Sequence, residues 1–98
     1  MIIEFRPAAR KELAAALQWY LSDGGPAVAE RFGWAVEHAI QLLTAMPQLG
    51  TLHHTGPTRN WPLKQFPYTL VYRVQGELLT VMAVAHQSRE PGYWVGRG

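Results

Sequence analysis

The feature that most constrains the fold of this chain is a change of hydrophobic period near its middle. Up to Pro47 the apolar residues recur at three- and four-residue spacing, which is typical of amphipathic helices. Beyond Pro57 they alternate with polar residues or form a continuous run, as in β-strands. The chain has 98 residues, a length that supports one domain over 1–98 with one hydrophobic core.

Two helices are expected before this change, over residues 8–21 and 27–46, each with one apolar stripe. The stripes contain Leu13, Ala16, Leu17, Tyr20 and Leu21 in the first helix, and Phe32, Val36, Ala39, Ile40 and Leu43 in the second. The stretch Ser-Asp-Gly-Gly at 22–25 is expected to break the helices apart, and Pro7 and Pro26 stand where a helix can begin. So short a break predicts a helical hairpin.

Strands are expected on both sides of the hairpin. Residues 2–5 form a short β-prone run before it, and residues 59–64, 69–74 and 78–86 follow it after a loop at 48–57. The order β-α-α-β-β-β predicts an α+β fold in which the hairpin packs on one face of a small, largely antiparallel sheet. The other face would have little to cover it, so we expect functional residues there.

Composition excludes several classes of protein. The chain has no cysteine, so neither a disulfide framework nor a thiolate zinc site is expected. It shows no signal peptide and no apolar run long enough to cross a bilayer, which makes the cytoplasm the expected location. Its net charge of +2 is only mildly basic, so any contact with nucleic acid would depend on a few arginines.

The common catalytic and cofactor motifs are absent. The sequence contains no phosphate-binding glycine loop, no dinucleotide fingerprint and no H-E-x-x-H metal motif. His53 and His54 are adjacent, and on an extended chain their side chains would point to opposite sides, which disfavours a metal site. Neither Ser22 nor Ser88 lies in a nucleophile elbow. We therefore expect no metal and no cofactor.

The groups that remain gather near the ends of the last strands. They are Arg59, Lys64, Arg73, His86, Arg89, Tyr93 and Trp94. Arginine binds phosphate oxygens, histidine exchanges a proton near neutral pH, and aromatic rings stack on bases. Together these groups can bind RNA and cleave it through the 2′-hydroxyl without a metal.

Each of these residues also has a purely structural interpretation. His86 can donate a hydrogen bond to a backbone carbonyl, and Arg73 can pair with Glu77 or Glu90. The aromatic pair at 93–94 can close the open end of the core rather than stack on a ligand.

The motifs of the chain resemble those of the RelE/ParE superfamily of bacterial toxins. Residues 7–13 are similar to the opening pattern P-x-A-x-x-[DE]-L, and residues 32–50 to the second helix and its exit through Met-Pro. Residues 59–73 resemble R-x-x-x-[LV]-x-x-[FY]-P-[YF]-x-[IVL]-x-[FY]-[RK]. Residues 81–94 resemble [IV]-x-x-[VI]-x-H-x-x-R-x-P-x-x-W. The resemblance covers almost the whole chain in order.

The resemblance implies a toxin with one of two activities. RelE-like toxins cleave messenger RNA in the ribosomal A site, and on this chain the catalytic residues would be Arg73, His86, Arg89 and Tyr93. ParE-like toxins inhibit DNA gyrase. The ParE-like branch is favoured, because the sheet region has a single lysine, Lys64, and the net charge is low. A third hypothesis is a module that binds an antitoxin and has no activity.

The resemblance also implies a cognate antitoxin, with operator DNA bound only through it and no contact with a membrane. We expect an acidic antitoxin segment to lie between the hairpin and the sheet, anchored by the exposed tryptophans Trp19, Trp34 or Trp61. Arg59, Lys64 and Trp94 are further candidates for binding the target or partner. Trp34 lies off the apolar stripe of its helix, so we predict that it is exposed.

Overall fold

The computed structural model describes residues 1–54 and 56–97, and it confirms the expected α+β order with one additional short strand. The elements are β1 (Ile2–Phe5), α1 (Pro7–Gly24), α2 (Pro26–Ala45), β2 (Thr51–Leu52), β3 (Arg59–Pro62), β4 (Tyr68–Gln75) and β5 (Leu78–His86). The additional strand, β2, lies in the stretch 48–57 that the sequence predicts as a loop, and it pairs with the first two residues of β3.

The break between the helices is shorter than the sequence predicts. Helix α1 continues through Gly24, and only Gly25 separates it from α2. Gly25 has φ +86° and ψ 176°, a conformation that residues with a Cβ rarely adopt. This single glycine therefore turns the chain from one helix into the next, and Pro26 begins α2 with the φ that a helix needs.

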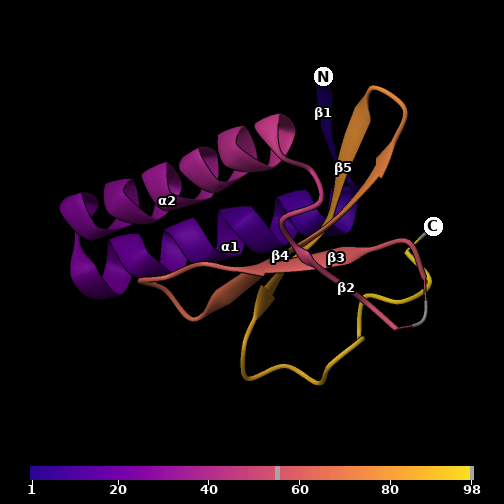
Figure 1. The fold of residues 1–98 in the computed structure, drawn as a ribbon. Helices are drawn as coiled ribbons and strands as arrows, with labels where there is room; N and C mark the ends of the chain where they lie inside the picture. Colours follow the sequence, from indigo (N-terminus) through magenta and orange to yellow (C-terminus); the bar gives the residue numbers. More distant parts are fainter. Residues whose placement is uncertain (55, 98) are drawn as a thin grey trace.

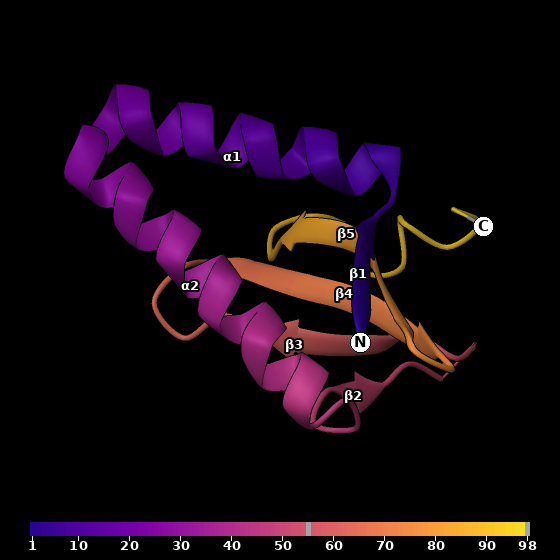
Figure 2. The ribbon, with the colours of Figure 1, turned by 90° about the horizontal axis from the view of Figure 1, so that it is seen from above.

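The strands form one five-stranded sheet in the order β1-β5-β4-β3-β2. Strand β1 pairs with β5 in parallel, and the other pairs are antiparallel. Figures 1 and 2 show both helices on one side of the sheet, with α1 alongside β5 and α2 crossing toward β3 and β2. Between β1 and its parallel neighbour β5 the chain runs through the helical hairpin and then through β2, β3 and β4.

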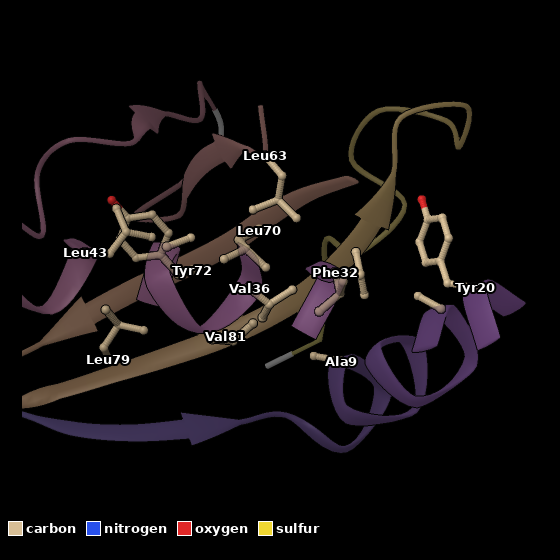
Figure 3. Packing of buried hydrophobic residues seen from close by; sticks show 13 residues of the cluster. Ala9, Tyr20, Phe32, Val36, Leu43, Leu63, Leu70, Tyr72, Leu79 and Val81 are labelled. Atoms are coloured by element: carbon tan, nitrogen blue, oxygen red, sulfur yellow. The ribbon is translucent and has the colours of Figure 1, made fainter. Parts of the chain in front are cut away.

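The main core lies between the hairpin and the sheet (Figure 3). Its largest fully buried side chains include Phe32 and Leu43 from α2 and Leu70, Tyr72 and Leu79 from the sheet. The predicted stripe of α2 is confirmed, because each of its residues is buried or packs on this core. In α1 one residue of the predicted stripe, Leu21, does not pack on the core.

The prediction for Leu21 is wrong: its side chain is 44% exposed. The four other residues of the α1 stripe lie in the main core or pack against it. Leu21 follows directly after the buried Tyr20, one step of about 100° around the helix, and this step turns it away from the sheet.

The second face of the sheet is covered, contrary to the expectation from sequence. Trp94, from the segment after β5, packs on Val71, Met82, Ala83 and Ala85. A β-bulge in β5 helps to build this face, because Val71 pairs with Ala83 and Tyr72 with Val81, which leaves Met82 as the extra residue. Met82 and Ala83 consequently both belong to the second face.

Candidate functional site

The residues predicted from the last strands are divided between two places. His86, Arg89, Tyr93 and Trp94 line one hollow of about 200 Å³ on the second face of the sheet, here called the C-terminal hollow. Arg73 lies elsewhere, because it pairs with Thr80 across the sheet while His86 pairs with Tyr68. Five residue steps along β4 separate Arg73 from Tyr68, which corresponds to roughly 17 Å. The expected convergence of all four catalytic candidates is therefore not found.

Ser88 orients the His86 ring. The backbone N–H of Ser88 donates to Nδ1 of His86 at 3.0 Å, and the Ser88 hydroxyl lies 2.7 Å from the same nitrogen. The ring also packs edge-on against Tyr68, with 5.0 Å between centroids. A backbone N–H at Nδ1 makes this nitrogen an acceptor, which leaves the proton of the neutral ring on Nε2. In this bond His86 accepts through Nδ1, whereas the structural interpretation offered by the sequence has the ring donate to a backbone carbonyl.

The Tyr93 hydroxyl is held by a carboxylate from the first helix. It donates to Oε2 of Glu12, which also accepts from Nη2 of Arg97 at 3.2 Å. Burial, followed by the hydrogen bond to Glu12 and the negative charge of Glu12, raises the pKa of Tyr93 to about 12. Tyr93 therefore stays protonated at neutral pH, and its hydroxyl is already used within the fold.

Glu12 also protects the edge of β5. Strand β1 ends at Phe5, opposite Val81, and beyond this point the backbone N–H of Val84 donates to Oε1 of Glu12 at 3.0 Å. Arg97 donates to the same oxygen at 2.8 Å and to the backbone carbonyl of Met82 at 3.2 Å. Two side chains thus satisfy backbone groups that the short β1 leaves open.

The charges around Glu12 set its ionisation. Burial by itself disfavours the carboxylate, but the hydrogen bonds from Arg97, Tyr93 and the Val84 backbone outweigh it and hold the pKa of Glu12 below its usual value. The hydrogen bond to Glu12 likewise raises the pKa of Arg97. Glu12 and Arg97 are therefore ionised together.

Arginine also contacts the Tyr93 ring. The guanidinium carbon of Arg89 lies 4.0 Å from the centroid of this ring, and that of Arg97 lies 5.0 Å from it. These distances suit cation–π attraction. Arg89 is itself exposed, so it presents its charge at the rim of the C-terminal hollow.

Trp94 has a packing role. It is only 6% exposed, and the ring of His53 lies edge-on to it with 4.8 Å between centroids. The structural interpretation of this residue is therefore the one that the geometry supports, since a buried ring offers little surface to a partner.

A second candidate site is the hairpin groove, which lies between α2 and β3. Its volume is about 250 Å³, and its lining includes Ala35, His38 and Leu42 from α2 and Trp61, Leu63 and Lys64 from the sheet side. Trp34 is 56% exposed, as predicted, and His38 follows it one helical turn later on the same side of α2. Trp61 is less exposed than expected because it packs against the main core.

Comparison with known proteins agrees with this geometry. The family model described as the ParE toxin of the type II toxin-antitoxin system, parDE, matches residues 3–91. The chain belongs to the ParE toxin family. A solved structure described as the chromosomal ParDE TA system from P. aeruginosa shares the fold, with a TM-score of 0.75 and 18% sequence identity, over 88% of this chain and 95% of that chain. A search of curated proteins found no match.

The match to the ParE family model ends at Pro91. It therefore includes Glu12 but not the C-terminal residues described above. Glu12 lies inside the matched range, in the opening motif, whereas Tyr93, Trp94 and Arg97 lie beyond it. The sequence pattern predicted Tyr93 and Trp94 as candidate site residues, but it did not indicate Glu12 or Arg97. The signal for Glu12 was present as the acidic position of the family-like opening pattern, and its partner lies more than eighty residues away in sequence.

Arg59, predicted to bind a target or partner, forms hydrogen bonds within the fold. Its guanidinium donates to the backbone carbonyls of Gln48 at 3.2 Å and Gly50 at 2.9 Å. The Tyr72 hydroxyl holds the same turn, because it donates to the carbonyl of Pro47 at 2.7 Å and accepts from the N–H of Gly50 at 3.0 Å. The exit from α2 is thus fastened to the sheet.

The expectation that His53 and His54 point apart is wrong. Their ring centroids lie 4.4 Å apart, because this part of the chain turns rather than extends. Within residues 1–54 and 56–97 there is no group of three or more side chains suited to hold a metal ion. The same residues contain no helix with the length and apolar character needed to cross a membrane.

Proposed function

We propose that this chain is a toxin that inhibits DNA gyrase by binding it, and that a cognate antitoxin neutralises the toxin. The match to the ParE toxin model over residues 3–91 carries this proposal. Binding requires an exposed surface but no catalytic group. The cytoplasmic location expected from the sequence remains a prediction.

The chemistry around the C-terminal hollow supports binding over RNA cleavage. Two of the four groups that a nuclease would use are arranged otherwise. The Tyr93 hydroxyl is held by Glu12 and the pKa of Tyr93 is raised to about 12, and Arg73 lies apart from His86. A general base works best with a pKa near the working pH, so Tyr93 is poorly suited to this role.

We assign the hairpin groove to the antitoxin. Trp34 and Leu42 are exposed beside it, and Lys64 adds a positive charge at its rim. An acidic segment with apolar anchors complements this surface and the +2 charge of the chain. The antitoxin then represses the shared operon and carries the complex to operator DNA.

Two assays test the function. Purified protein should stop gyrase from supercoiling relaxed plasmid, and its induction should arrest the growth of a bacterial host. Unchanged supercoiling at stoichiometric excess would overturn gyrase as the target, and normal growth would support a module without activity. Cleavage of A-site messenger RNA on translating ribosomes would instead establish the nuclease alternative.

Binding of the antitoxin is tested with the small acidic protein that we expect to be encoded directly upstream. Trp34→Ala should weaken this complex by at least tenfold, in keeping with the loss of an aromatic anchor. Trp19→Ala is the matched control, since Trp19 is equally exposed, at 57%, and lies on α1, whereas Trp34 lies on α2, the helix that lines the groove. Equal losses from both variants would contradict the assignment.

A further inference from the structure

A third hollow, which shares His86 with the C-terminal hollow, lies where the turn between α1 and α2 meets the ends of β4 and β5. It has a volume of about 670 Å³ and is lined by Trp19, Tyr20, Asp23, Val28, Tyr68 and His86, among others. We call it the aromatic hollow. Figures 1 and 2 show this turn at the same end of the molecule as the connection from β3 to β4.

Aromatic rings in contact with one another form much of its wall. Trp19 is 57% exposed and meets Tyr20 edge-on, with 5.1 Å between centroids. The ring centroid of Tyr20 in turn lies 6.2 Å from that of Tyr68, and the ring centroid of Tyr68 lies 5.0 Å from that of His86. Tyr20 belongs to the main core (Figure 3), and Tyr68 packs against that core, so the wall is continuous with it.

The charge of the hollow favours a cation. Its described lining contains the carboxylate of Asp23 and includes neither lysine nor arginine. Burial raises the pKa of both Tyr20 and Tyr68, so their rings remain neutral, and the faces of aromatic rings attract positive charge. An exposed carboxylate beside such rings matches a guanidinium or an ammonium group that carries an apolar stem.

We propose that the aromatic hollow binds an arginine or lysine side chain of the toxin's protein target. The target, rather than the antitoxin, is the occupant, because an acidic antitoxin segment would be repelled by Asp23. The hollow also shares no lining residue with the hairpin groove, so both sites can be occupied independently. This inference rests on the proposed function for its partner, but the binding chemistry can be tested alone.

The first experiment measures binding chemistry with small probes. N-acetyl-arginine amide is titrated into the protein, and N-acetyl-citrulline amide serves as its uncharged counterpart. We expect the indole N–H signal of Trp19 to shift with the arginine probe, and Asp23→Asn to weaken this response by about fivefold. Glu30→Gln, an exposed acid elsewhere on the hairpin, should leave it unchanged. Equal shifts with both probes, or shifts confined to Trp34, overturn the proposal.

The second experiment connects the hollow with the target. Trp19→Ala and Asp23→Lys should each reduce gyrase inhibition by at least tenfold while antitoxin affinity stays within twofold of wild type. Both residues are exposed, so the variants should melt like the wild type. Loss of antitoxin binding in place of gyrase inhibition overturns the proposal. If the wild-type protein leaves gyrase untouched, the proposed function fails, and the probe titration still decides whether the hollow binds a cation.

Discussion

The carboxylate of Glu12 and the guanidinium of Arg97 form a bidentate ion pair between the first helix and the C-terminal segment. The two contacts measure 2.8 and 3.2 Å, and the side chains are 18% and 22% exposed. Because Glu12 also binds Tyr93 and the backbone of Val84, one carboxylate fastens the segment that covers the second face of the sheet.

Replacing Glu12 by glutamine should destabilise the fold. The variant keeps the shape of the side chain but loses the charge that strengthens the bonds from Arg97, which we expect to cost about 1–2 kcal/mol in the free energy of unfolding. Urea denaturation measures this loss. Glu30→Gln is the control, since Glu30 is exposed on α2, and an equal effect of both variants would contradict the role of Glu12.

Acid should weaken the same contact. The pKa of Glu12 is lower in the folded state than its ordinary value of 4.5, so its contribution is fully present above that pH and is lost as the pH falls through the folded-state pKa. The free energy of unfolding should therefore fall more between neutral pH and about pH 3 in the wild type than in Glu12→Gln. Parallel pH profiles for the two proteins would refute the prediction.

Removal of the Tyr93 hydroxyl should leave the toxin active. Tyr93→Phe keeps the ring beside Arg89 and loses only the hydrogen bond to Glu12, so we expect undiminished growth arrest on induction. Because the pKa of Tyr93 is raised to about 12, the wild type should also lose stability as the pH rises through that value, and the variant should lose less. Loss of growth arrest in a folded variant would point to the nuclease alternative.

Substitution by alanine should destabilise the protein strongly at Trp94 and hardly at all at Trp34. Trp94→Ala removes a ring that is 6% exposed and packs on the second face, which we expect to cost about 3–5 kcal/mol. Trp34→Ala removes a ring that is 56% exposed and should change stability by about 0.5 kcal/mol at most. Thermal and urea unfolding of the two variants provide the comparison, and similar losses would show that Trp94 is not part of the packed face.

Gly50 should tolerate no side chain. A Cβ at this position would lie 2.6 Å from the hydroxyl oxygen of Tyr72 and 3.0 Å from the Cβ of Arg59. Gly50→Ala should therefore destabilise the protein by about 1–3 kcal/mol, the usual cost of overpacking. Combining it with Tyr72→Phe should recover part of the loss by removing the nearest atom, and strictly additive effects in the double variant would argue against this clash.

The hydrophobic period of the sequence was sufficient to predict both helices, the last two strands and the α+β order. These elements depend on spacing between neighbours, as with Phe32, Val36 and Leu43 on one side of α2. The exposure of Trp34 followed from the same geometry, because a residue off the apolar stripe turns away from the core. Such features are local, and local spacing is visible in a single sequence.

Only the tertiary structure showed that the second face of the sheet is covered and that the candidate catalytic residues lie apart. The bulge at Met82 and the covering by Trp94 depend on pairing between distant segments, as does the distance between Arg73 and His86. Glu12 carried a recognisable motif position, yet its partners are the backbone of β5 and side chains more than eighty residues away. Hydrogen bonds and ion pairs of this kind arise from the folded arrangement of the chain, and the spacing of residues along the sequence does not encode them.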